Sequence, residues 1–173
     1  MDILAHGLYG GALSKALRNK IPKEKRKRFF WWAFLFGILP DFIAFAPSFF
    51  IGIFNGHGGH HSGMGNLDLS AYIYNFSHSL IIFLCVLLLV RVISKKWWLP
   101  LFAWPLHIIM DIPLHSPDFF PTPFLFPLST YTLPIGIPWG TPQIFFSLWG
   151  ILIVYYLIRF LKEKREKRLS SVN

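Results

Sequence analysis

One uncharged run decides the fold class: Leu80-Ile-Ile-Phe-Leu-Cys-Val-Leu-Leu-Leu-Val90. It is the core of a longer segment, Leu69 to Val90, that contains no Lys, Arg, Asp or Glu. A helix of about 20 predominantly apolar residues is long enough to cross the hydrocarbon core of a bilayer. This segment therefore predicts a membrane-spanning helix.

The composition of the whole chain agrees with that prediction. Of the 173 residues, 54% are hydrophobic and only 14% are charged, against roughly 25% charged residues in an ordinary soluble domain. A chain of about 150 residues buries only about 70% of its surface when it folds, so a soluble domain could not hide this much apolar surface. We therefore expect an all-α integral membrane protein.

Three further apolar segments extend the pattern to four transmembrane helices. They run from Phe29 to Phe54, from Trp97 to His115 and from Gln143 to Ile158. A weaker segment, Ile3 to Leu17, is short for a full crossing and carries Gly7 and Gly11 at the spacing of helix-packing glycines. We expect a short N-terminal helix there, which could span, re-enter or pack against the other helices.

The positive charges predict the orientation. The net charge of +9 is concentrated in short runs, Lys20 to Arg28 and Lys162 to Arg168, and the order of the four spans brings both runs to one face. The positive-inside rule makes that face cytoplasmic, in a cell inner (plasma) membrane. Runs that flank apolar spans favour anionic lipids over nucleic acid as the partner. The expected organisation is a single membrane-embedded domain, residues 1–161, and a basic cytoplasmic tail, residues 162–173.

The ionisable residues inside the spans predict a metal site. Each such residue costs about 2.5–3.5 kcal/mol near the bilayer centre, so it needs a partner or a purpose. Counted at about 1.5 Å per helical residue, all of them lie roughly 15–21 Å from the basic face. Histidine and aspartate without Lys or Arg form a set of transition-metal ligands. The five residues are His6, Asp41, His78, His107 and Asp111.

Local sequence supports two of these positions. His107 and Asp111 are four residues apart, which puts both on one helix face. Pro40 is expected to break the helix just before Asp41 and to aim that carboxylate into a cavity enclosed by protein. Taken singly, His6 could be an ordinary packing residue, Asp41 a helix N-cap and His78 an interhelical hydrogen-bonding group.

Other histidines leave alternatives open. His115 follows Asp111 by four residues, but Pro113 lies between them. The Gly-rich loop from Asn55 to Gly65 carries His57, His60 and His61. These three could collect a metal ion or be incidental to a mobile loop.

The order of these motifs resembles a known family. The chain has Ala5-His6-Gly7, Ile38-Leu-Pro-Asp41, Phe76-Ser-His78-Ser79, and His107 to Asp111 followed by a Pro-rich loop. This order is similar to that of the bacterial and archaeal inner-membrane metal-dependent hydrolases typified by the LexA-binding inner membrane protein. It resembles, more distantly, the ligand order of the zinc-dependent phospholipase C and P1 nuclease superfamily.

The resemblance implies a membrane-bound hydrolase that acts on a lipid or other membrane-derived phosphoester through a metal-activated water. The five His and Asp residues would hold a divalent metal, zinc by analogy. Asp111 would bridge two metals, and Asp41 would be a ligand or the general base. The chain lacks the later His and the HxxxE motif of the soluble phospholipases, which favours one or two ions over three. The alternatives are a non-enzymatic protein that binds or transports a metal, and a metal that only clamps the helices.

Overall fold

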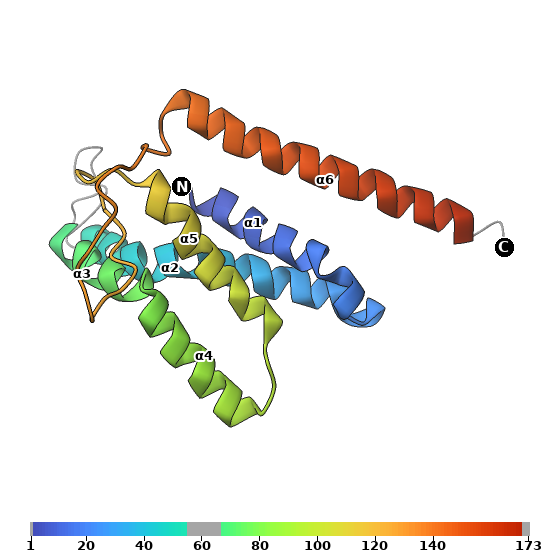
Figure 1. Ribbon diagram of the computed structural model, residues 1–173, viewed down its shortest axis with the longest axis horizontal. Helices are drawn as coiled ribbons and strands as arrows, with labels where there is room; N and C mark the ends of the chain where they lie inside the picture. Colours follow the sequence, from blue (N-terminus) through green and yellow to red (C-terminus); the bar gives the residue numbers. More distant parts are fainter. Residues whose placement is uncertain (1, 55–66, 171–173) are drawn as a thin grey trace.

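The computed structural model describes residues 2–54 and 67–170, and these residues form helices joined by loops and turns (Figure 1). The prediction of an all-α protein is confirmed for this part of the chain. His57, His60 and His61 lie outside the described residues. The helices are α1 (Ile3–Ala16), α2 (Arg26–Phe54), α3 (Leu67–Ser77), α4 (Leu80–Ser94), α5 (Ala103–Leu114) and α6 (Pro142–Ser170), with short 3-10 turns at Arg18–Lys20, Lys23–Lys25 and Leu99–Phe102.

Two or three helices are apolar and long enough to cross a membrane. One is α2 with the turn before it, Lys23–Phe54, and another is α6 over Pro142–Leu169. The predicted span from Leu69 to Val90 is divided between α3 and α4, which meet at an angle of 55° and give a third crossing if they count as one. The apolar helix over Leu99–Leu114 is shorter than the other candidates. The structure thus supports two or three of the four predicted spans.

The bend between α3 and α4 has a local cause. Ser79 is the N-cap of α4, and its side-chain oxygen accepts hydrogen bonds from the backbone N–H groups of Ile81 and Ile82, at 3.1 and 3.2 Å. An N-cap of this kind starts a new helix because it satisfies N–H groups that have no partner in the preceding turn. His78 consequently lies at the junction of two helices and not in the middle of one.

The expected break at Pro40 is wrong, because α2 continues through both Pro40 and Pro47. Proline removes one backbone N–H and crowds the carbonyl four residues earlier, but a neighbouring helix can offset the loss in a membrane protein. The carbonyl four residues before Pro40 is that of Phe36, and the next carbonyl, that of Gly37, accepts a hydrogen bond from His107 Nδ1 at 2.6 Å, which ties α2 to α5 beside the proline. Asp41 is buried within a continuous helix, as one of the side chains that face α5.

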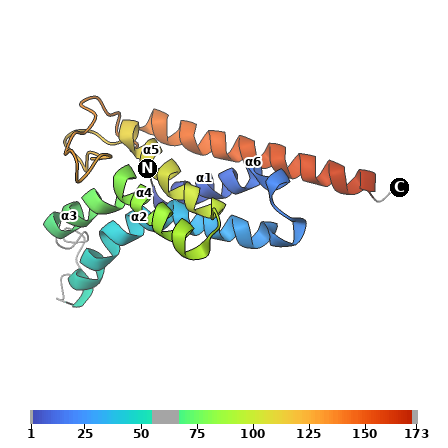
Figure 2. The same ribbon diagram turned by 60° about the horizontal axis from the view of Figure 1, so that its bottom comes forward.

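Glycines allow α1 to pack closely against α2. A Cβ on Gly37 would lie 2.5 Å from the carbonyl oxygen of His6, and a Cβ on Gly10 would overlap the carbonyl oxygen of Ala33. Figures 1 and 2 show α1 lying between α2 and α6, and it also contacts α5. Of the three alternatives for the N-terminal helix, the structure shows packing against the other helices.

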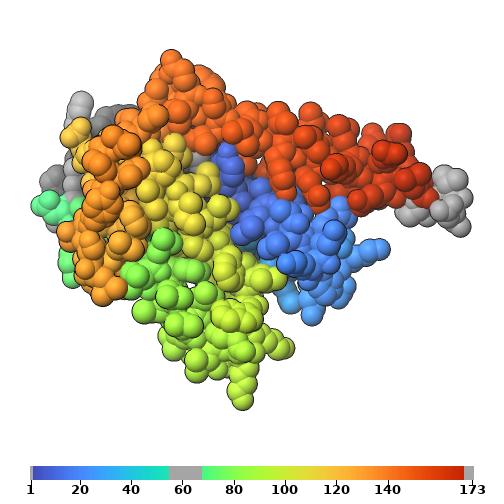
Figure 3. Space-filling model, in the orientation of Figure 1, coloured from blue at the N-terminus to red at the C-terminus, as the bar shows by residue number. Residues whose placement is uncertain are grey.

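The basic ends of α1 and α6 lie together. Lys15 forms an ion pair with Glu163 at 3.2 Å, and Arg18 pairs with Glu166 at 3.2 Å. The residues of the predicted tail up to Ser170 continue α6 as helix. At the opposite end of the molecule, the loop between α5 and α6 lies over the other helices in the space-filling view, where it is orange (Figure 3). One end of the molecule therefore carries basic residues with their ion pairs, and the other end is covered by the loop between α5 and α6.

Candidate metal centre

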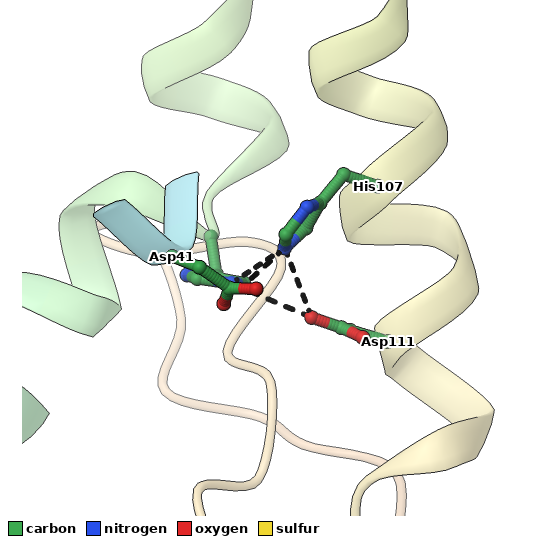
Figure 4. Close-up of side chains that lie close together, drawn as sticks. Asp41, His107 and Asp111 are labelled. Atoms are coloured by element: carbon green, nitrogen blue, oxygen red, sulfur yellow. Dashed lines mark hydrogen bonds and ion pairs between the residues drawn. The ribbon is translucent and has the colours of Figure 1, made fainter. Parts of the chain in front are cut away.

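Four buried side chains converge from three parts of the chain. Asp41 comes from α2, His78 from the junction of α3 and α4, and His107 and Asp111 from α5. Figure 4 shows Asp41, His107 and Asp111 pointing toward one another. One ligand atom from each of the four residues lies within 4.8 Å of the other three. His78 and Asp111 have no exposed surface, His107 is 1% exposed and Asp41 is 8% exposed.

The spacing of these atoms fits a metal ion. His78 Nε2 lies 3.0 Å from His107 Nε2, and it lies 3.4 Å from Asp41 Oδ1 and 3.4 Å from Asp111 Oδ2. His107 Nε2 lies 3.6 Å from Asp41 Oδ1 and 3.1 Å from Asp111 Oδ2. Ligand bonds of about 2.0–2.1 Å in a tetrahedral zinc site place neighbouring ligand atoms about 3.3–3.4 Å apart. The five separations that involve a histidine nitrogen, 3.0–3.6 Å, are therefore close to those of a tetrahedral two-nitrogen, two-oxygen site, and the two carboxylate oxygens lie within 4.8 Å of each other.

Hydrogen bonds to the opposite ring nitrogens favour the tautomers that bind metals. The Gly37 carbonyl can only accept, so His107 Nδ1 carries the proton, and Nε2 presents its lone pair to the cluster in the neutral ring. Ser77 Oγ lies 2.9 Å from His78 Nδ1 and donates to the Tyr74 carbonyl at 3.4 Å, so it can accept from His78 Nδ1. Such outer partners fix the orientation of metal-binding imidazoles.

His6 occupies the other side of Asp111. Its Nε2 is 2.9 Å from Asp111 Oδ1, and its ring stacks on His107 with the centroids 3.6 Å apart. The imidazole is 1% exposed, and its Nδ1 has no hydrogen-bond partner among the described residues. A buried imidazole in this position is suited to coordinate an ion on the second oxygen of Asp111.

His115 extends the polar cluster toward the loop after α5. Its Nε2 lies 3.7 Å from Asp111 Oδ1, and its Nδ1 lies 2.7 Å from the Phe120 carbonyl and 2.8 Å from the Tyr74 hydroxyl. The Tyr74 hydroxyl also lies 2.9 Å from Thr122 Oγ1. The Tyr74 ring stacks on His78 with the centroids 3.6 Å apart. This network links the cluster to the loop that covers one end of the molecule.

One side of the cluster faces a cavity of about 520 Å³. Asp41 and His115 line this cavity. The Asp41 side chain is 11% exposed, whereas the side chains of His78, His107 and Asp111 have no exposed surface. The cavity therefore reaches the cluster at Asp41.

All five residues that the sequence predicts as metal ligands are brought together. Four of them form the group with mutually close ligand atoms, and His6 contacts the second oxygen of Asp111. Tyr74, Ser77 and Thr122, and the carbonyls of Gly37 and Phe120, were not predicted. Ser77 directly precedes His78, and Tyr74 lies four residues before His78. This short spacing from a candidate ligand is the sequence feature that could have indicated them.

Comparison of the chain with protein-family models, with curated proteins and with solved structures finds no match. The fold and the buried cluster described above are thus the observations on which a function can be argued.

Proposed function

We propose that the protein is a membrane-embedded, metal-dependent hydrolase of phosphoesters. His78, His107 and Asp111 hold one divalent ion, and Asp41 is its fourth ligand or the general base. Zinc suits imidazole and carboxylate ligands at this spacing. The observation that carries the proposal is the near-tetrahedral set of four buried ligand atoms with one open side. His6 and the second oxygen of Asp111 offer the position for a second ion.

The open side favours catalysis over a structural clamp. Structural zinc sites are closed by four protein ligands, whereas catalytic sites keep a position for water or substrate. Here Asp41 lies at the wall of a cavity of about 520 Å³, a volume typical of small-molecule sites. If Asp41 does not bind the ion, its coordination position is open to a water molecule or a substrate from the cavity.

The ion and the residues around it would have different roles in hydrolysis. A bound divalent ion would supply an acidified water and an electrophilic pull on the phosphoryl group. Asp41 is the carboxylate nearest the cavity, so it is suited to accept a proton from the attacking water. His78 and His107 are held by Ser77 and by the Gly37 carbonyl, which keeps their Nε2 atoms aimed at one point.

We further propose that four segments cross a cell inner membrane: α2, the bent pair of α3 and α4, the helical segment Leu99–Leu114, and α6. The basic ends of α1 and α6 would face the cytoplasm according to the positive-inside rule. Their ion pairs, Lys15 with Glu163 and Arg18 with Glu166, support a common face for them.

Metal content and hydrolysis measured on the same purified protein test the function. We expect zinc to copurify, and we expect the zinc-loaded protein to hydrolyse bis(p-nitrophenyl) phosphate in a chelator-sensitive manner. Asp41→Asn should reduce this hydrolysis by a factor of about 100 or more, as loss of a general base does. A protein that binds zinc, hydrolyses no phosphodiester and moves zinc across liposome membranes would instead be a transporter.

A further inference from the structure

The cavity beside Asp41 has aromatic walls. Phe42, Phe45, Phe49 and Phe50 line it from α2, and Phe119 and Phe120 line it from the loop after α5. The four residues of α2 recur at intervals of three, four and one, which places them on one side of the helix. The cavity thus extends along the second half of α2, starting beside Asp41 of the metal-binding cluster.

Three ionisable side chains line the cavity. Asp41 and His115 belong to the cluster. A third polar residue, Asp2, is already engaged, since it accepts hydrogen bonds from the backbone N–H of Ala5 at 2.9 Å and from Trp149 Nε1 at 3.0 Å. An occupant of this cavity would meet metal-binding groups at one end and phenyl rings along its length.

This distribution of polar and apolar groups selects the occupant. A sugar or a nucleoside can stack on phenyl rings, but its hydroxyl and amide groups would find few hydrogen-bond partners along these walls. A hydrocarbon chain has no such groups and gains from burial against aromatic walls. Its polar head would lie at Asp41.

Several of the phenylalanines that line the cavity are also exposed at the surface of the protein. Phe42 is 54% exposed, Phe49 53%, Phe50 51% and Phe119 49%. On α2, which is long and apolar enough to cross a membrane, exposed phenyl rings face the hydrocarbon of the bilayer. A chain could then enter the cavity sideways from the bilayer without passing through water.

We propose that this cavity binds the hydrocarbon chain of the substrate, so that the enzyme acts on an amphiphile whose phosphoester head reaches Asp41 while its tail lies along Phe45 and Phe49. The proposal rests on the hydrolase function proposed above and adds a substrate class and a chain-binding subsite to it. A soluble phosphoester without a chain would occupy only the polar end.

A chain-length series tests the subsite. Zinc-loaded protein in nanodiscs is given p-nitrophenyl phosphodiesters that carry a methyl, an octyl or a hexadecyl group, and kcat/KM is measured for each. Ala46→Trp places an indole in the cavity, because Ala46 lines it between Phe45 and Phe49. Ile43→Trp is the matched control, since Ile43 is on the same helix, is 37% exposed and is not among the lining residues.

We expect the hexadecyl ester to exceed the methyl ester by a factor of about 10–100 in kcat/KM, the range expected for apolar contacts in a pocket. Ala46→Trp should bring this ratio close to one, and Ile43→Trp should keep it. Because long chains also concentrate in nanodiscs, the comparison of the two tryptophan variants is the decisive one. Equal ratios in both variants would overturn the proposal.

A binding measurement separates the subsite from hydrolysis. A hexadecyl phosphonate with a photoreactive diazirine at its tail cannot be hydrolysed, and mass spectrometry locates where it attaches. We expect attachment within residues 42–50 and 119–120 that excess unlabelled hexadecyl phosphonate prevents. Such attachment without hydrolysis of any ester would refute the hydrolase and keep the subsite. Hydrolysis without competed attachment, or cross-linking to a second copy of the chain, would refute the subsite.

Discussion

His107 is the residue on which the cluster depends most. Its Nε2 faces both carboxylates and His78, while its Nδ1 is tied to the Gly37 carbonyl of α2. We expect His107→Ala to remove one ligand and to leave the other three ligands without the contacts that orient them. Bound zinc should then fall to less than about a tenth of an ion per chain. Elemental analysis of the purified variant measures this.

His6→Ala provides the contrast. Because His6 lies outside the four-residue group and meets it through the second oxygen of Asp111 and the ring of His107, this variant should retain about one ion in that group. A normally folded His107→Ala protein with its full metal content would refute the assignment of the ligands.

Ser77 tests the role of the outer partners. It lies 2.9 Å from His78 Nδ1 and is 3% exposed. Removing an outer partner of a metal-binding histidine weakens metal binding by a factor of about 10–100 without abolishing it. We expect Ser77→Ala to show this loss in a competition with a chelator, and Ser94→Ala, at the far exposed end of α4, to show none. Unchanged affinity in Ser77→Ala would mean that Ser77 does not orient the ring.

At the level of residues, the sequence was most informative where the bilayer makes a polar group costly. Each of the five residues has an ordinary explanation when taken singly, but five ionisable groups at one depth in apolar spans favour a shared site. They are His6, Asp41, His78, His107 and Asp111. The outer partners could not be predicted, because Ser77 and Tyr74 are ordinary in a helix and backbone carbonyls have no sequence signal. Their contribution depends on a contact between helices, such as that of Gly37 with His107.

At the level of elements, the close approach of α1 and α2 is open to a direct test. A Cβ on Gly10 would overlap the backbone of Ala33, which cannot move aside without displacing α2. We expect Gly10→Ala to destabilise the fold by about 1–3 kcal/mol, as overpacking does, and to lower the melting temperature in detergent. Gly150→Ala on α6 is the control, because a Cβ there meets nothing within 4 Å. Equal melting temperatures for both variants would refute close packing at Gly10.

Helix boundaries were harder to predict than helices. The run from Leu80 to Val90 correctly predicted a helix, but the serines beside His78 gave too weak a signal for the break that Ser79 produces as an N-cap. Pro40 gave too strong a signal, because a proline penalty measured in isolated helices ignores the packing of neighbouring helices, which here includes the bond from His107 of α5 to the Gly37 carbonyl of α2. In both cases a neighbouring element decided the outcome.

At the level of the whole molecule, the basic residues and the metal-binding cluster with its cavity lie at different positions along the helices. Lys15 and Arg18 of one end pair with Glu163 and Glu166, while His115 and the cavity lie where α5 meets its following loop. The loop after α5 contains no Lys or Arg over residues 116–141. Under the proposed function, a lipid head would reach the cluster from that side. The proposed orientation and the proposed substrate together predict that the site binds lipid from the non-cytoplasmic side of the membrane.

Cysteine accessibility in intact cells tests that orientation. In a background with Cys85→Ala, we expect Lys25→Cys and Lys164→Cys to react with a membrane-impermeant maleimide only after the cells are permeabilised, because both positions belong to the basic face. Tyr131→Cys should react in intact cells, since Tyr131 is 53% exposed in the loop at the other end. Three proposed crossings separate positions 25 and 131, so their reaction from the same side would mean that α2, the α3–α4 pair and Leu99–Leu114 do not all cross. The reverse pattern would place the cavity on the cytoplasmic side.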